Sequence, residues 1–334
     1  MRSNRTSTAA AASLGLVASV TLVVVTVMRD APSHGVVAAA CSAGMEAFVE
    51  PRSLPPGTSE ITLLFHDPQS GREAPMKVLA YFPKSVDTGK PTDVLFVMHG
   101  VKRDAEAEFR RIIPLGSSRN THSLLPETHN FVLLIPEFSN VLFPHRNAYN
   151  FGGMFEDEDP ARPRARERWA FSAIESIFHA VESAAKLRTS GFHLFGHSAG
   201  AQFVHRYVAF ANSSARACGA ACPHRLVRAI AANAGSYTLP SFHERFPFGF
   251  GGLEARVSAH DLAAFVSAPL TVLLSELDTD PQHKHLPQDE AANRQGAHRV
   301  ARGDHFFHSG QTCAATIGVP FGWTRHIMPG IGHS

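Results

Sequence analysis

The sequence predicts one α/β domain with a mostly parallel central sheet of about eight strands and helices on both faces. Two observations predict this fold. First, short segments rich in Val, Leu, Ile and Phe alternate with stretches of helical periodicity along most of the chain. Second, one expected strand leads directly into Gly196-His197-Ser198-Ala199-Gly200, and a helical stretch follows at once.

The expected strands are separated by Pro, Gly, Asp and Ser residues that favour turns. They cover residues 60–66, 76–83, 93–98, 131–135, 191–195, 226–232, 270–274 and 323–328. Apolar residues recur at helical spacing over residues 103–113, 165–187 and 199–211, and these stretches are expected to form helices. A Phe-, Pro- and Gly-rich insertion, residues 239–252, interrupts the alternation.

Composition limits the classes of function. Of the 334 residues, 44% are hydrophobic and 18% are charged, so the chain can bury a large core and is not expected to be disordered. The formal net charge is only +2, and the Lys and Arg residues are scattered. Because contacts to a phosphate backbone need clustered cations, we do not expect a nucleic-acid partner.

The N-terminal segment has the pattern of an export signal. Arg2 and Arg5 precede an apolar run over residues 9–28, and the small residues 38–40 follow. The run is long for a signal peptide, and about 20 apolar residues can span a bilayer. We therefore expect residues 1–40 to be a signal peptide or membrane anchor, and residues 41–334 to form a single domain outside the cytoplasm. Contact with a membrane is expected only through that segment.

Four cysteines, Cys41, Cys218, Cys222 and Cys313, permit two disulfides in an exported chain. Three connectivities are allowed, and the sequence does not choose among them. The spacing of Cys218 and Cys222 could also suit a metal clip, but no second closely spaced Cys or His pair completes a tetrahedral set.

Ser198 is the expected nucleophile. In a Gly-x-Ser-x-Gly turn between a strand and a helix, the glycines allow a strained backbone that exposes the serine hydroxyl above the sheet. Here an apolar strand precedes the turn and a helical stretch follows it, so both neighbours have the required pattern.

A serine hydroxyl needs a base to take its proton, and the base needs a carboxylate to orient it. In this kind of arrangement the acid and then the histidine follow the serine along the chain. Asp278, after the strand 270–274, is the expected acid, with Asp280 as its rival and Glu276 as a weaker third candidate.

His333 is the expected base. It follows the last expected strand and lies in a Gly-Ile-Gly-His turn that could direct an imidazole back toward the sheet. The competing histidines, His305 and His308, precede that strand and therefore do not fit the order.

Two backbone N–H groups are also needed to stabilise the oxyanion that develops on a carbonyl substrate. One should come from Ala199, which follows the nucleophile. The other should come from Val101, in the His99-Gly100-Val101 run after the strand 93–98.

These motifs resemble the α/β-hydrolase superfamily, and within it the bacterial esterases and the poly(3-hydroxybutyrate) depolymerase-like hydrolases. The similar segments extend from about residue 75 to the end of the sequence. They are 99–105, 136–139, 149–152, 196–206, 233–238, 276–280 and 329–333. The resemblance implies an α/β-hydrolase fold and hydrolysis of a small or polymeric ester through an acyl-enzyme, with no metal or organic cofactor. Tyr149, Asn150 and Tyr237 are candidate substrate contacts, as are the phenylalanines of the 239–252 insertion, although these aromatic loops could equally pack in the core.

Two alternatives remain open. The same three catalytic groups could cleave amides, as in a peptidase or amidase. A non-catalytic exported binding protein could also keep the fold. In most members of the superfamily a helix follows the base, whereas this sequence ends one residue after His333.

Overall fold

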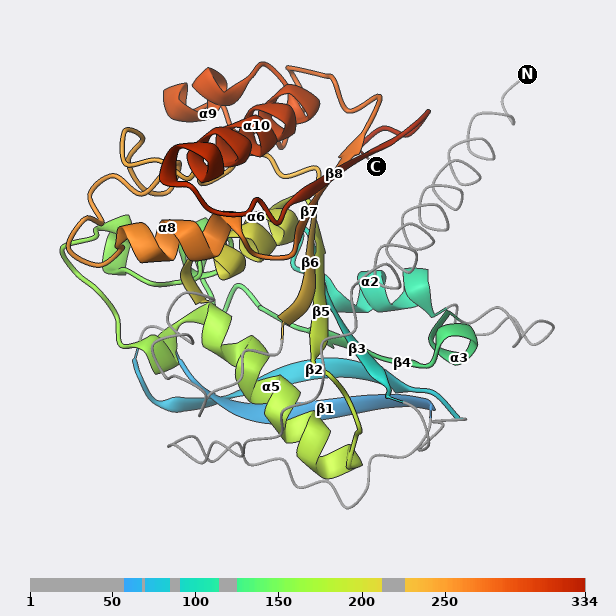
Figure 1. Ribbon diagram of the computed structural model, residues 1–334. Helices are drawn as coiled ribbons and strands as arrows, with labels where there is room; N and C mark the ends of the chain where they lie inside the picture. The colour runs from blue at the N-terminus through green and yellow to red at the C-terminus, as the bar shows by residue number, and fades with distance from the viewer. Residues whose placement is uncertain (1–56, 68–69, 85–90, 114–124, 212–225, 334) are drawn as a thin grey trace, which may run out of the picture.

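The computed structural model describes residues 57–67, 70–84, 91–113, 125–211 and 226–333 (Figure 1). The predicted signal or anchor and Cys41, Cys218 and Cys222 lie outside these residues. Export, cleavage, the disulfide pairing and the assignment of residues 41–334 to one domain therefore stay predictions. Within the described part of the chain, no helix is both long enough and apolar enough to cross a bilayer.

The central sheet has eight strands in the order β1-β2-β4-β3-β5-β6-β7-β8. The strands β4, β3, β5, β6, β7 and β8 run parallel, whereas β2 is antiparallel to both β1 and β4. Their bounds are Gly57–His66, Glu73–Phe82, Asp93–Met98, Phe131–Pro136, Phe192–His197, Leu226–Ala232, Leu270–Ser275 and Thr324–Met328, from β1 to β8. The predicted mostly parallel sheet of eight strands is confirmed, and every strand lies within a few residues of its expected position.

Alternate residues of the central strands enter two separate cores, one on each face of the sheet. In β3, Val94, Phe96 and Met98 face one core, while Leu95 and Val97 face the other. In Figure 1 the helices α2 (Ala105–Ile112) and α3 (Leu125–His129) cover one face, and α5 (Ala170–Ala185), α6 (Ala199–Arg206) and α8 (Ala259–Val266) cover the other. Burial on both faces accounts for the nearly uninterrupted apolar composition of these strands.

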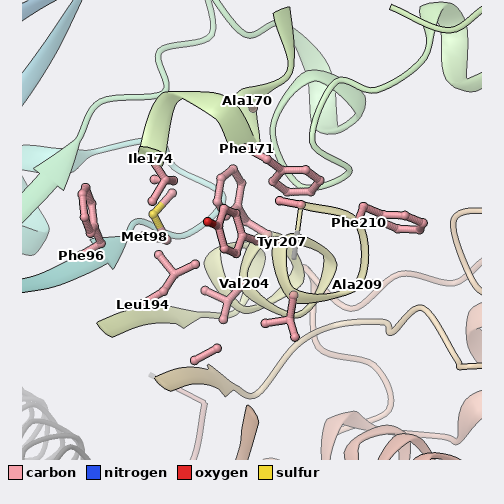
Figure 2. Packing of buried hydrophobic residues seen from close by; sticks show 14 of the residues in the cluster. Phe96, Met98, Ala170, Phe171, Ile174, Leu194, Val204, Tyr207, Ala209 and Phe210 are labelled. Carbon is pink, nitrogen blue, oxygen red and sulfur yellow. The ribbon is translucent and has the colours of Figure 1, made fainter. Parts of the chain in front are cut away.

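The larger core lies between the sheet and the layer of α5 and α6. Figure 2 shows Phe171 and Ile174 of α5 close to Tyr207 and Met98 in this core. The predicted helix over residues 165–187 begins at Ala170, because Trp169 has an extended backbone, and it ends at Ala185, because Lys186 has a left-handed backbone. Shorter helical turns are α4 (His145–Ala148), η2 (Glu156–Glu158), η3 (Arg166–Arg168) and the π-helical η4 (Tyr207–Ala211).

Three helices that the sequence did not predict follow β6: α8, α9 (Glu290–Gln295) and α10 (Arg299–Ile317). The 19-residue α10 is the longest of them. Its buried residues are Arg299, Arg302, Gly303, Phe306, Gly310 and Ala314. Because arginine and glycine form most of this buried stripe, hydrophobic periodicity does not reveal the helix.

Trp323, just before β8, connects α8 and α10 to the edge of the sheet. Its ring lies 4.4 Å from that of Phe306 and 4.9 Å from that of Phe265, between ring centroids. The indole N–H donates to the carbonyl of Phe265 at 2.9 Å, so the ring is both packed and hydrogen-bonded. Gly310 is required beside it, since a Cβ at this position would collide with the indole ring.

Replacing Trp323 by Ala should lower the free energy of unfolding by about 3 to 5 kcal/mol, because it leaves a cavity among three elements. The midpoint of urea denaturation measures this change. Val141→Ala is the control, since that side chain is 89% exposed and its loss should change stability by less than about 0.5 kcal/mol. Equal midpoints for the two variants would contradict the assigned packing role.

Candidate active site

The turn between β5 and α6 has the strained geometry that the sequence predicted. Ser198 has φ 58° and ψ −113°, a conformation that non-glycine residues rarely adopt. A Cβ on Gly196 would collide with the backbone of Gly200, and a Cβ on Gly200 would collide with the carbonyl oxygen of Met98. Both glycines are therefore required by close backbone contacts, and these contacts hold the serine at the carboxyl edge of the sheet.

Ser198, His333 and Asp278 come from the ends of three parallel strands and meet at this edge. His333 Nε2 lies 3.2 Å from Ser198 Oγ, and His333 Nδ1 lies 2.6 Å from Asp278 Oδ2. A carboxylate can only accept, so Nδ1 carries the proton, and in the neutral ring Nε2 can then accept from the serine hydroxyl. The arrangement suits general-base activation of a serine.

The rival residues have other hydrogen-bond partners or are exposed. The Asp280 side chain is exposed and accepts from the backbone N–H of Gln282. Glu276 accepts from the backbone N–H of Gly330 at 2.7 Å. His305 and His308 are exposed on α10, where His308 pairs with Gln311 at 3.0 Å.

Asp278 is 3% exposed, yet the structure favours its ionised form. Burial by itself raises the pKa of this carboxyl, but the hydrogen bond to His333 and the charges of His333 and Arg299 hold the pKa below its usual value. Arg299 donates to Asp278 Oδ1 at 3.4 Å from the start of α10. Sequence reasoning missed Arg299, because it lies in a helix with no recognisable pattern.

Two further imidazoles contact the ring of His333. The ring centroid of His197 lies 4.7 Å from that of His333, and that of His283 lies 4.9 Å from it. Burial, helped by the neighbouring His333, lowers the pKa of His197 to about 3, so this ring is neutral near neutral pH. His197 belongs to the Gly-x-Ser-x-Gly turn, but its contact with His333 could not be read from the motif.

Backbone hydrogen bonds to the residues after β7 hold the turn that carries His333. Leu277 N–H donates to the carbonyl of Ile331 at 2.8 Å, and Glu276 N–H donates to that of Met328 at 3.0 Å. The carboxylate of Glu276 accepts from Gly330 N–H, as described above. The acid and base segments are therefore joined directly to each other.

The loop after β3 carries Val101, which is 49% exposed. Ala199 N–H belongs to the first turn of α6, where backbone donors have no acceptor within the helix. The buried side chain of His99 anchors the start of this loop, because its Nε2 accepts from Phe138 N–H at 3.0 Å. Burial lowers the pKa of His99 to about 4, so it remains a neutral structural residue.

The three expected substrate contacts are buried, and this corrects the expectation for them. Tyr149 and Tyr237 are both 0% exposed and Asn150 is 8% exposed. The Tyr149 hydroxyl donates to the carbonyl of His99 at 2.7 Å, while the ring of Tyr237 stacks on that of Phe306. Both tyrosines therefore support the loops of the site from within the core and cannot reach a substrate there.

The aromatic insertion also packs inward. Phe250 is fully buried and Phe246 nearly so, while Phe242 packs against the same core from its edge. The ring of Phe246 contacts those of Phe155 and Phe210. Of the two roles left open for these phenylalanines, core packing is the one their burial supports.

No group of three His, Cys, Asp or Glu side chains within the described residues is arranged to hold a metal ion. His283 Nδ1 lies 3.3 Å from Arg299 Nη2 and accepts from the backbone N–H of His285 at 3.3 Å.

Comparison with known proteins gives many similar solved structures, among them two that share more than 30% sequence identity with this chain over most of its length. Poly(aspartic acid) hydrolase-1 from Sphingomonas sp. KT-1 is 34% identical with a TM-score of 0.71, over 84% of this chain and 95% of that one. LpqC, a poly(3-hydroxybutyrate) depolymerase from Bordetella parapertussis, is 32% identical with a TM-score of 0.68, over 83% of this chain and 85% of that one. No protein-family model and no curated protein matches the sequence.

The fold, the strand-to-helix turn and these similarities agree. Identity above 30% extends over more than four-fifths of the chain in both cases, and both neighbours are hydrolases. The chain is a hydrolase that belongs to the α/β-hydrolase superfamily, among the bacterial esterases and poly(3-hydroxybutyrate) depolymerase-like serine hydrolases.

Proposed function

We propose that the protein hydrolyses carboxylic esters through an acyl-enzyme on Ser198. The observation that carries the proposal is the unbroken contact from Asp278 Oδ2 through the His333 ring to Ser198 Oγ, at 2.6 and 3.2 Å. Ser198 Oγ attacks the ester carbonyl while His333 Nε2 takes the hydroxyl proton. Asp278 holds the ring and stabilises the imidazolium that forms.

The remaining steps follow from the same groups. The N–H groups of Val101 and Ala199 donate to the developing oxyanion, which lowers the barrier for attack. The imidazolium then gives its proton to the departing alkoxide, and the alcohol leaves the acyl-enzyme. Water attacks the acyl carbonyl and gives a proton to His333. The imidazolium then returns a proton to Ser198 Oγ as the bond between Oγ and the acyl carbon breaks, which releases the free acid and regenerates the serine hydroxyl.

Substitution of the nucleophile and the base tests this mechanism. Ser198→Ala and His333→Ala should each lower kcat for p-nitrophenyl butyrate by about 10⁶-fold, because the two residues act as one unit. The measurement is the rate at which the protein that begins near Cys41 releases p-nitrophenolate. His308→Ala is the matched control, since that imidazole is exposed on α10 and should be dispensable.

A fluorophosphonate probe distinguishes the enzyme from a binding protein that keeps only the fold. Labelling requires an activated serine, so the parent and His308→Ala should be labelled and Ser198→Ala should not. A folded parent that neither reacts with the probe nor releases p-nitrophenolate would disprove the hydrolytic mechanism and favour the binding role.

The choice of Asp278 over Asp280 is tested by isosteric amides. Asp278→Asn should lower kcat by about 10⁴-fold, because an amide no longer selects the imidazole tautomer that accepts the serine proton. Asp280→Asn should leave kcat within about 2-fold of the parent, since the exposed side chain supports only a local turn. The opposite ranking of the two variants would transfer the acid role to Asp280.

Amide cleavage is the second candidate, and the similarity to a poly(aspartic acid) hydrolase favours it. Poly(aspartic acid) is joined by amide bonds, and poly(3-hydroxybutyrate) by ester bonds. We expect poly(3-hydroxybutyrate) to be shortened faster than poly(aspartic acid), because an alkoxide depends less than an amine on the proton that the His333 imidazolium gives to the leaving group. Size-exclusion chromatography of both polymers measures this. Shortening of poly(aspartic acid) alone would establish the amidase instead.

A further inference from the structure

Arg299 is a fully buried cation beside the proposed catalytic groups. It is the first residue of α10, and its side chain is 0% exposed. A buried guanidinium is costly unless its donors find acceptors. Burial lowers the pKa of Arg299, and the nearby carboxylate of Asp278 opposes that effect.

The two terminal nitrogens of Arg299 are divided between two residues. Nη1 donates to Asp278 Oδ1 at 3.4 Å, and Nη2 lies 3.3 Å from His283 Nδ1. A guanidinium has no acceptor, so His283 Nδ1 must accept and the His283 ring must be neutral. Burial lowers the pKa of His283, and the charge of Arg299 lowers it further.

Both partners of Arg299 contact His333. The other oxygen of Asp278 bonds to His333 Nδ1 at 2.6 Å, and the ring of His283 packs at a steep angle on that of His333, 4.9 Å away. Through these two partners, one guanidinium supports both the hydrogen bond to His333 Nδ1 and the ring contact with His283. Movement of Arg299 would release both contacts at once.

We propose that Arg299 is a positioning residue that holds Asp278 and His283 against His333 and thereby fixes the ring of the general base. This inference rests on the hydrolytic function proposed above. Arg299 does not touch the serine or the substrate carbonyl in this role. It acts through two contacts on one ring, so its loss should reduce turnover more than substrate affinity.

Charge gives the proposal a second consequence. A cation disfavours protonation of nearby imidazoles, so its removal should move the acidic limb of the pH profile of kcat to higher pH. The charged and titratable groups that act on His333 or on the imidazoles and the guanidinium near it are His197 on β5, Asp278, Asp280, His283, Lys284 and His285 after β7, Arg299 on α10, Lys102 after β3 and Arg111 on α2. Of the cations among them, Arg299 is the one in hydrogen-bond contact with Asp278.

The same helix supplies a matched control. Arg302 is as deeply buried as Arg299 and lies one turn further along α10. Its guanidinium donates to the carbonyls of Gly235, Gly296 and Pro287 and to the amide oxygen of Asn293. Loss of Arg302 therefore disturbs packing and loop support but removes no contact with Asp278 or His283.

The experiment compares Arg299→Gln, Arg299→Lys and Arg302→Gln in the chain from about Cys41 onward. For each variant, kcat and KM for p-nitrophenyl butyrate are measured from pH 5 to 9. The concentration of active sites, which is needed for kcat, is determined by titration with a fluorophosphonate. Arg299→Gln should lower kcat by about 10- to 100-fold with little change in KM, because small displacements of catalytic groups cost that much. The acidic limb of its pH profile should move to higher pH.

Arg299→Lys keeps the charge but not both hydrogen bonds, so it should retain the parent's acidic limb and recover part of kcat. Arg302→Gln should lower the thermal midpoint while leaving the pH profile and kcat per titrated site unchanged. A profile for Arg299→Gln that matches that of Arg302→Gln would overturn the positioning role. If Arg299→Gln does not fold, His283→Gln replaces it and should lower kcat, since it removes the packed ring.

The same measurements distinguish a failure of the positioning role from a failure of the proposed hydrolysis. An active parent with unaffected Arg299→Gln and His283→Gln variants overturns the positioning role alone. A folded parent that neither hydrolyses the ester nor reacts with the fluorophosphonate overturns the hydrolytic proposal, and the role of Arg299 falls with it.

Discussion

The contact of helix α6 with strand β3, backbone against backbone, is the constraint on which the rest of the site depends. Gly200 lies so close to the carbonyl of Met98 that no side chain fits between them, and Gly196 is equally close to Gly200. This approach holds Ser198 at its strained positive φ. Because β7 and β8 run parallel to β5, the residues that follow them arrive at the same edge of the sheet.

Around this edge, buried arginines donate hydrogen bonds to polar groups of the irregular loops. Arg103 donates to the carbonyls of Phe138 and His145, and Arg206 donates to that of Pro247 and to the hydroxyl of Thr238. Burial lowers the pKa of Arg103 to about 10 and that of Arg206 to about 9, so both remain charged near neutral pH. Loop carbonyls lack the regular partners of a sheet, and the forked guanidinium supplies several donors from one side chain.

Sequence patterns succeeded where the signal is local. The β3 strand was predicted with its observed bounds, and the turn at Ser198 was predicted with the steric reason for its glycines. They failed for α10, whose buried stripe consists largely of arginine and glycine. They also misjudged Tyr149 and Tyr237, since aromatic residues near a site can either line it or support it, and burial alone distinguishes the two.

By itself, the sequence determined the class of fold, the identity of the strained serine and the order of the acid and base candidates along the chain. These depend on local spacing and on the alternation of strands and helices, which neighbouring residues encode. Only the tertiary structure decided that Asp278 and not Asp280 faces His333, and that Arg299 and His283 support the pair. Such contacts join residues from separate elements, and their side-chain directions are set by packing that no local pattern records.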